Sequence, residues 1–126
     1  MLHHSSFAVS DIARSAAFYD AVLPTLGYIC VWANETAVGY GSQGGEDKFA
    51  IKLRSRGVTI PGDGFHVAFS APSQEAVDRF YKTALEHGGI NNGGSGFHPE
   101  YGAKYFAAFV IDPDGYRIEA VLDHPV

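Results

Sequence analysis

The 126-residue sequence is poor in cysteine and basic residues and has no long apolar run. Because Cys30 is the only cysteine, no disulfide can form within the chain, and we expect a protein of the reducing cytoplasm. Nine Lys and Arg against fourteen Asp and Glu give a net charge of −5 without a basic cluster, which argues against nucleic-acid binding. No apolar stretch approaches the roughly 20 residues of a membrane-spanning helix. We also expect no signal peptide at residues 1–8, and neither nucleic acid nor membrane among the partners.

What the sequence does contain is enough apolar material for one folded domain over residues 1–126, since 46% of its residues are hydrophobic. It also repeats itself with an offset of 62 residues (80 − 18). This offset superimposes Phe18-Tyr19 on Phe80-Tyr81, Phe7 on Phe69, Leu23 on Leu85, Gly27 on Gly89 and His4 on His66. A repeat of this kind predicts two copies of one structural unit, over about 1–56 and 64–126.

Each copy has the same predicted order of elements, β-α-β-β-β, and therefore an α+β fold. In the first copy we expect strands at 2–9, 28–33, 37–41 and 48–53 and a helix at 12–26. In the second copy we expect strands at 65–71, 90–93, 104–111 and 116–122 and a helix at 73–87. A turn at 112–115 joins the last two strands. Cys30 falls in a strand, where we expect it to be buried and inert.

Alternation along the strands places four polar side chains on the face turned away from the helices, namely His4, Lys52, His66 and Glu119. Two imidazoles and a carboxylate around one cavity are a suitable set for a divalent metal ion, with further positions left for water or substrate. These ligand types suit Fe, Mn, Zn, Ni or Co and do not select among them. Aromatic and polar residues expected in the cavity wall are Phe97, His98, Tyr101, Tyr105, Trp32 and Tyr40.

The motifs at both ends resemble those of the glyoxalase/bleomycin-resistance/extradiol-dioxygenase group, the vicinal oxygen chelate superfamily, and in particular its lactoylglutathione-lyase-like members. They comprise residues 4–11 with Phe18-Tyr19 and residues 26–28, then His66, Phe80 and residues 109–119. The resemblance implies two βαβββ modules that form a half-open, barrel-like sheet around a central cavity. It also implies a homodimer, and metal ligands from the first and last strands of each module. The corresponding positions are His4, Lys52, His66 and Glu119, and Lys52 departs from the carboxylate of glyoxalase I.

Two functions follow from this resemblance. The first is a metal-dependent lyase, isomerase or dioxygenase acting on a small oxygen-chelating substrate, with His4, His66 and Glu119 as ligands. Its general base would be Tyr105, His98 or Lys52, among which the sequence does not select. The alternative is a metal-free protein that binds and sequesters a small molecule, as bleomycin-resistance members do. In that case Lys52 pairs with Glu119, whose other candidate partner is Arg117, and the cavity holds an ion pair.

Overall fold

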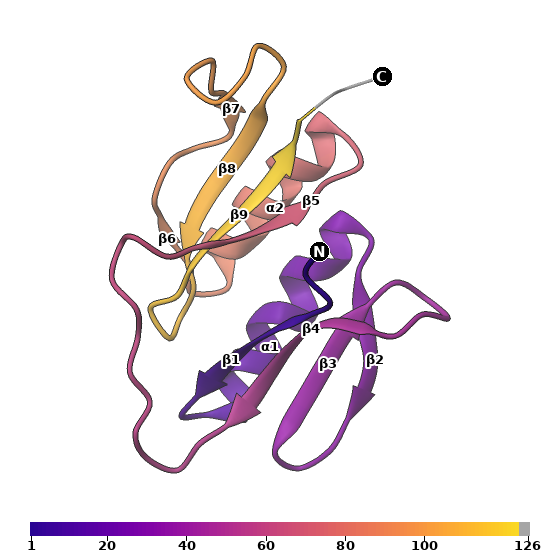
Figure 1. The fold of residues 1–126 in the computed structure, drawn as a ribbon, viewed down its shortest axis with the longest axis vertical. Helices are drawn as coiled ribbons and strands as arrows, with labels where there is room; N and C mark the ends of the chain where they lie inside the picture. Colours follow the sequence, from indigo (N-terminus) through magenta and orange to yellow (C-terminus); the bar gives the residue numbers. More distant parts are fainter. Residues whose placement is uncertain (124–126) are drawn as a thin grey trace.

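A computed structural model describes residues 1–123 and divides them into two α+β modules (Figure 1). The first module consists of β1 (Ser5–Val9), α1 (Ile12–Val22), the short 3-10 helix η1 (Leu23–Leu26), β2 (Ile29–Ala33), β3 (Ala37–Gly41) and β4 (Asp47–Leu53). The second consists of β5 (Val67–Ser70), α2 (Gln74–Glu86), β6 (Ile90–Asn91), β7 (Gly96–Phe97), β8 (Phe106–Ile111) and β9 (Arg117–Leu122).

Each module has a mixed sheet with one helix across one face. The strand orders are β1-β4-β3-β2 and β5-β9-β8-β6, and β7 pairs with β8 outside this path. In both sheets the first strand runs parallel to the last one, and all other pairs are antiparallel. The two sheets do not close into one barrel, which confirms the predicted half-open α+β arrangement.

The helices reproduce the repeat found in the sequence. Helices α1 and α2 begin 62 residues apart (74 − 12). Their N-cap side chains, Asp11 and Ser73, accept hydrogen bonds from the backbone N–H groups of Arg14 and Ala76. The first helix was predicted to run to residue 26, but it changes to a 3-10 helix at Leu23. Pro24 lies in this turn, where it cannot donate the backbone hydrogen bond of an α-helix.

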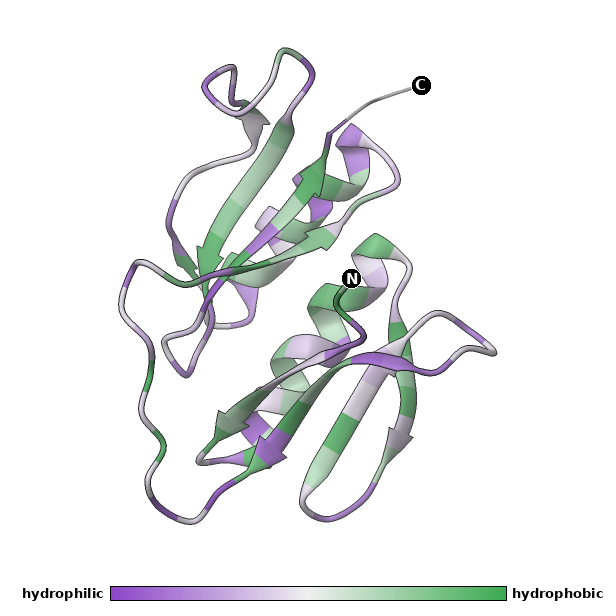
Figure 2. Cartoon of the chain, viewed as in Figure 1, coloured by the Kyte–Doolittle hydropathy of each residue, from purple (hydrophilic) through white to green (hydrophobic). Residues whose placement is uncertain are grey.

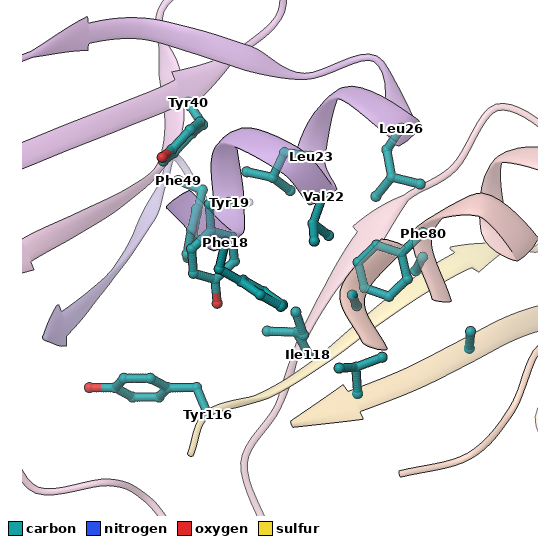
Figure 3. Close-up of a cluster of buried hydrophobic side chains, with 14 of the residues drawn as sticks. Phe18, Tyr19, Val22, Leu23, Leu26, Tyr40, Phe49, Phe80, Tyr116 and Ile118 are labelled. Carbon is teal, nitrogen blue, oxygen red and sulfur yellow. The ribbon is translucent and has the colours of Figure 1, made fainter. Parts of the chain in front are cut away.

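The hydrophobic core lies between the helices and the covered faces of both sheets (Figure 3). Hydrophobic residues follow the strands, whereas hydrophilic residues concentrate in the connecting loops (Figure 2). Phe80 of α2 points toward Val22 and Leu26 of the first module in Figure 3, and all three side chains are buried. Phe7 of β1 stacks on Tyr116, with ring centroids 4.0 Å apart. The two modules therefore share one core.

The loop between β8 and β9 fastens the second module to α1. The buried carboxylate of Asp112 accepts a hydrogen bond from the hydroxyl of Tyr19 at 2.5 Å, as well as bonds from the backbone N–H groups of residues 114 and 116. The carboxylate of Asp114 accepts from Arg14 and Ser15. This turn therefore contributes to the contact between modules and is more than a loop connecting two strands.

Further local predictions differ from the structure, among them the strand predicted at 2–9, which begins at Ser5 and so leaves His4 outside it. Cys30 lies in a strand as expected, but it is exposed because β2 is the outer strand of its sheet. The strand predicted at 104–111 begins at Phe106, and the short strand β7 was not predicted.

Within residues 1–123, no helix is long and apolar enough to cross a membrane.

Candidate functional site

Glu119 is a buried acidic residue on the face of β9 that no helix covers. Its relative exposure is only 1%. The hydroxyl of Tyr105 donates a hydrogen bond to Oε2 of Glu119 at 2.5 Å, and Nε2 of His66 lies 2.9 Å from Oε1. A buried carboxylate needs such partners because its desolvation is costly. Both oxygens of Glu119 are thus satisfied by side chains of the second module.

Tyr105 is fixed as a proton donor in this cluster. Burial, followed by the hydrogen bond to Glu119, raises the pKa of the Tyr105 hydroxyl well above its usual range. The phenol therefore stays protonated near neutral pH. This disfavours the predicted role of Tyr105 as a general base and suits it to orienting Glu119 or donating a hydrogen bond.

A cavity of about 330 Å³ opens beside this cluster. Its lining includes Asp63, His66, Asn92, His98, Tyr101 and Arg117. A small cavity with aromatic walls and a few convergent polar groups is typical of a small-molecule site. We call it the module 2 pocket.

His98 forms part of the wall of the module 2 pocket. Its ring packs edge-on against Phe109 at a centroid distance of 5.1 Å and stacks with Tyr101 at 6.1 Å. The Nε2 atom of His98 is buried and has no hydrogen-bond partner among the described residues. Such an orphaned polar atom is costly unless another group satisfies it.

Of the three predicted metal ligands, the structure brings together two. His66 lines the module 2 pocket and contacts the buried Glu119 beside it, whereas His4 lies outside the pocket, with its Nδ1 2.8 Å from Nδ1 of His3. An imidazole nitrogen and a carboxylate oxygen are both suitable ligands for a first-row metal ion. Nε2 of His66 and Oε1 of Glu119 lie 2.9 Å apart, so both would hold such an ion from the same side of the second module. Within residues 1–123, however, no group of three His, Cys, Asp or Glu side chains is placed to hold a metal.

The register of the sheets corrects the position assigned to Lys52. Ala68 pairs with Glu119 in the second module, and its repeat counterpart Ser6 pairs with Ala50 in the first. The structural equivalent of Glu119 is therefore Ala50, two residues before Lys52 on the same face. No ion pair between Lys52 and Glu119, or between Arg117 and Glu119, is formed in the described part of the chain.

The other residues predicted for a cavity wall are divided among different places. His98, Tyr101 and Tyr105 surround Glu119 or the module 2 pocket, as described above. Phe97 is 56% exposed on β7. Tyr40 is buried, its hydroxyl donates to Asp20 at 2.9 Å, and its ring lines a different cavity, described below. Trp32 lies on the open face of the first module against Gly39, where an added Cβ would be 2.3 Å from the indole nitrogen.

Sequence reasoning did not place Asp63 or Asn92 in the pocket, and it considered Arg117 only as an ion-pair partner of Glu119. Asp63 and Asn92 lie outside the strands, where no periodicity indicates the direction of a side chain. Arg117 did carry a signal, because it is two residues before Glu119 in the same strand and faces the same side.

Comparisons with known proteins agree with this architecture. The family model for the Glyoxalase/Bleomycin resistance protein/Dioxygenase superfamily matches residues 1–120. A glyoxalase/bleomycin resistance protein from Albidiferax ferrireducens T118 is 32% identical, with a TM-score of 0.82 and 98% of each chain covered. A putative glyoxalase from Bacillus halodurans is 25% identical, with a TM-score of 0.67 and coverage of 96% of this chain and 94% of that one.

A more distant structure shares the fold alone. The fosfomycin resistance protein FosX from Mesorhizobium loti is 17% identical, with a TM-score of 0.67 and coverage of 98% of this chain and 92% of that one. No curated protein sequence matches the chain. The family match over most of the chain, together with the Albidiferax relative, shows that this protein belongs to the Glyoxalase/Bleomycin resistance protein/Dioxygenase superfamily.

Proposed function

We propose that this chain is a metal-dependent enzyme that acts on a small oxygen-rich substrate in the module 2 pocket. The observation that carries this proposal is the contact between two ligand-type side chains, the buried carboxylate of Glu119 and the imidazole of His66, which lines the pocket. A bound Fe, Mn, Ni, Co or Zn ion would supply Lewis-acid stabilisation of an enolate or oxyanion, as lyases, isomerases and dioxygenases require.

The residues around the proposed metal position have separate tasks. Tyr105 holds Glu119 through its hydrogen bond and keeps its own proton. His98, with its unpartnered Nε2, is the candidate general base within the pocket. The aromatic rings of Phe109 and Tyr101 limit access of water to His98.

His4 and Lys52, the remaining predicted site residues, belong to the first module. We propose a homodimer in which the first module of a second copy covers the module 2 pocket and brings His4 and Lys52 toward it.

The test mixes a His4→Ala variant with a Glu119→Gln variant. Random exchange of subunits gives about half heterodimers, each with one intact site, and therefore about a quarter of the wild-type metal content. If the metal content does not rise in a mixture whose subunits demonstrably exchange, the site is not shared between two copies.

A second function is favoured by one specific feature. Tyr105 and His66 already satisfy both oxygens of Glu119, and only two metal donors meet within residues 1–123. This arrangement suits a metal-free protein that binds or sequesters a small molecule.

Elemental analysis of untagged protein, purified without chelators, separates the two functions. For the enzyme we expect about one equivalent of a first-row metal in the wild type and a loss in His66→Ala and Glu119→Gln. The matched controls are His87→Ala and Glu86→Gln, which change exposed residues at the end of α2. If the wild type takes up none of the five metals even after incubation with them, the metal-dependent function is wrong and the binding function takes its place.

A further inference from the structure

A second cavity, larger than the module 2 pocket, has a volume of about 400 Å³. It lies between the two modules, and we call it the intermodule cavity. Its walls come from the N-terminal segment, from the first module and from β5. The N-terminus lies between the modules, next to β5 (Figure 1). The two cavities have no lining residue in common.

The interior of the intermodule cavity is apolar and aromatic. Its lining includes Leu23, Tyr28, Tyr40, Phe49 and Phe69. The two tyrosine hydroxyls are already used, because Tyr40 donates to Asp20 and Tyr28 donates to the backbone carbonyl of Ser70 at 2.8 Å. The body of a ligand in this cavity therefore meets hydrocarbon and ring surfaces, which favours an apolar molecule.

The charge of the lining has one sign. The chain carries a net charge of −5, yet no acidic side chain lines the described cavity. Lys48 lines it, together with His3 and His4. No ion pair within residues 1–123 involves Lys48, whose side chain is exposed. An ammonium without a carboxylate partner at the edge of an apolar cavity is suited to an anionic group.

We propose that the intermodule cavity is a second small-molecule site, which binds an apolar carboxylate with its hydrocarbon part between the modules and its carboxylate at Lys48. This site does not depend on the function proposed for the module 2 pocket. His4 is left unchanged in the test because it is also a predicted metal ligand.

The test compares octanoate with 1-octanol, which share a chain length and differ in charge. Calorimetric titration of the full chain should give tighter binding of octanoate than of 1-octanol. Lys48→Gln should weaken octanoate binding by about five-fold and leave 1-octanol binding unchanged, since it removes one partly solvated charge contact. The matched control Lys82→Gln removes an exposed lysine of α2 and should change neither affinity.

The location of the probe is tested separately. Val67, half-buried on β5, lines the cavity, and Val67→Trp should block both molecules. If this variant does not fold, nuclear Overhauser effects from octanoate to Leu23 and Phe69 in the wild type give the same information. Binding that is unaffected by Glu119→Gln would separate this site from the module 2 pocket. The proposal is overturned if the wild type binds neither molecule, if Lys48→Gln leaves the preference for octanoate intact, or if the contacts fall outside this cavity.

Discussion

At the scale of single residues, Glu119 and its partners determine what the second module can do. The carboxylate is nearly inaccessible, although it belongs to the face of β9 that no helix covers. Tyr105 and His66 compensate for its burial by hydrogen bonds. Because these partners come from outside β9, the cluster depends on how residues 98–105 and the start of β5 are folded.

The Tyr105→Phe variant tests the strength of this cluster. It removes the donor to Oε2 of Glu119 and should lower the free energy of unfolding by about 2 kcal/mol, since a buried acceptor loses its partner. Urea denaturation measures this change. Tyr101→Phe is the matched control, because Tyr101 is 62% exposed and its hydroxyl makes no hydrogen bond in the described residues. If Tyr105→Phe and the wild type have equal free energies of unfolding, the hydrogen bond from Tyr105 to Glu119 does not stabilise the fold.

Strand alternation predicted which face holds His66 and Glu119, but it could not determine register. Ala50 and Lys52 are both on the open face, so alternation alone allowed either to match Glu119. Only the pairing of β1 with β4 identifies Ala50. His4 and His66 both lie one residue before their strands, and what distinguishes them is a contact that the sequence could not show: His66 is held at Glu119, whereas His4 contacts His3.

At the scale of elements, the turn between β8 and β9 has an unexpected role. The sequence predicted the turn itself from its Asp, Pro and Gly residues. It could not predict that Asp112 and Asp114 bond to α1, about a hundred residues earlier, because such contacts leave no local pattern. The sequence predicted a single α-helix to residue 26, whereas the α-helix ends at Val22. Pro24 is compatible with a further turn of the 3-10 type, so the sequence did not show where the α-helix ends.

Asp112→Ala should lower the free energy of unfolding by about 3 kcal/mol, because the Tyr19 hydroxyl and two backbone donors lose their acceptor. Asp112→Asn is the matched control, since its carbonyl still accepts from the backbone and its amide can donate to Tyr19. Urea denaturation should rank the variants as wild type, then Asn, then Ala. A neutral effect of Ala would contradict the role of the turn as a contact between modules.

The same residue predicts a dependence of stability on pH. Burial is the main cause that raises the pKa of Asp112 above its ordinary value of 3.8. Asp112 therefore binds its proton more tightly in the folded state than in the unfolded state. The extra stability that comes from this tighter proton binding is fully present below pH 3.8 and is lost as the pH rises through the raised pKa, whereas the hydrogen bonds to the carboxyl group remain. Unfolding measured across this window should show a smaller pH dependence in Asp112→Asn; an identical profile would contradict this assignment.

At the scale of the whole molecule, two repeated modules form one folded unit because their helices share a core. The order of elements and the repeat were predictable, since apolar periodicity and the 62-residue offset are local or pairwise features of the sequence. The packing of one module on the other was not, because it depends on side chains that meet only after both sheets have formed.

Phe80→Ala tests whether the shared core couples the modules. Phe80 is fully buried and points toward α1 and η1 (Figure 3), so its loss should cost about 3–5 kcal/mol. Hydrogen exchange should accelerate in strands of both modules. Phe97→Ala, at an exposed position, is the control and should change little. Acceleration confined to the second module would show that the modules are stabilised independently.

The proposed function requires that His66 and Glu119 together hold a metal ion, and the chemical shift of the His66 ring nitrogen reports on this contact. Long-range proton–nitrogen spectra of the full chain should be recorded during titration with Zn²⁺. We predict that the Nε2 signal of His66 moves to the position of a metal-bound nitrogen at about one equivalent. This change should be absent in Glu119→Gln, and His87 should not respond. A His66 signal that stays unchanged in excess Zn²⁺ would contradict the claim.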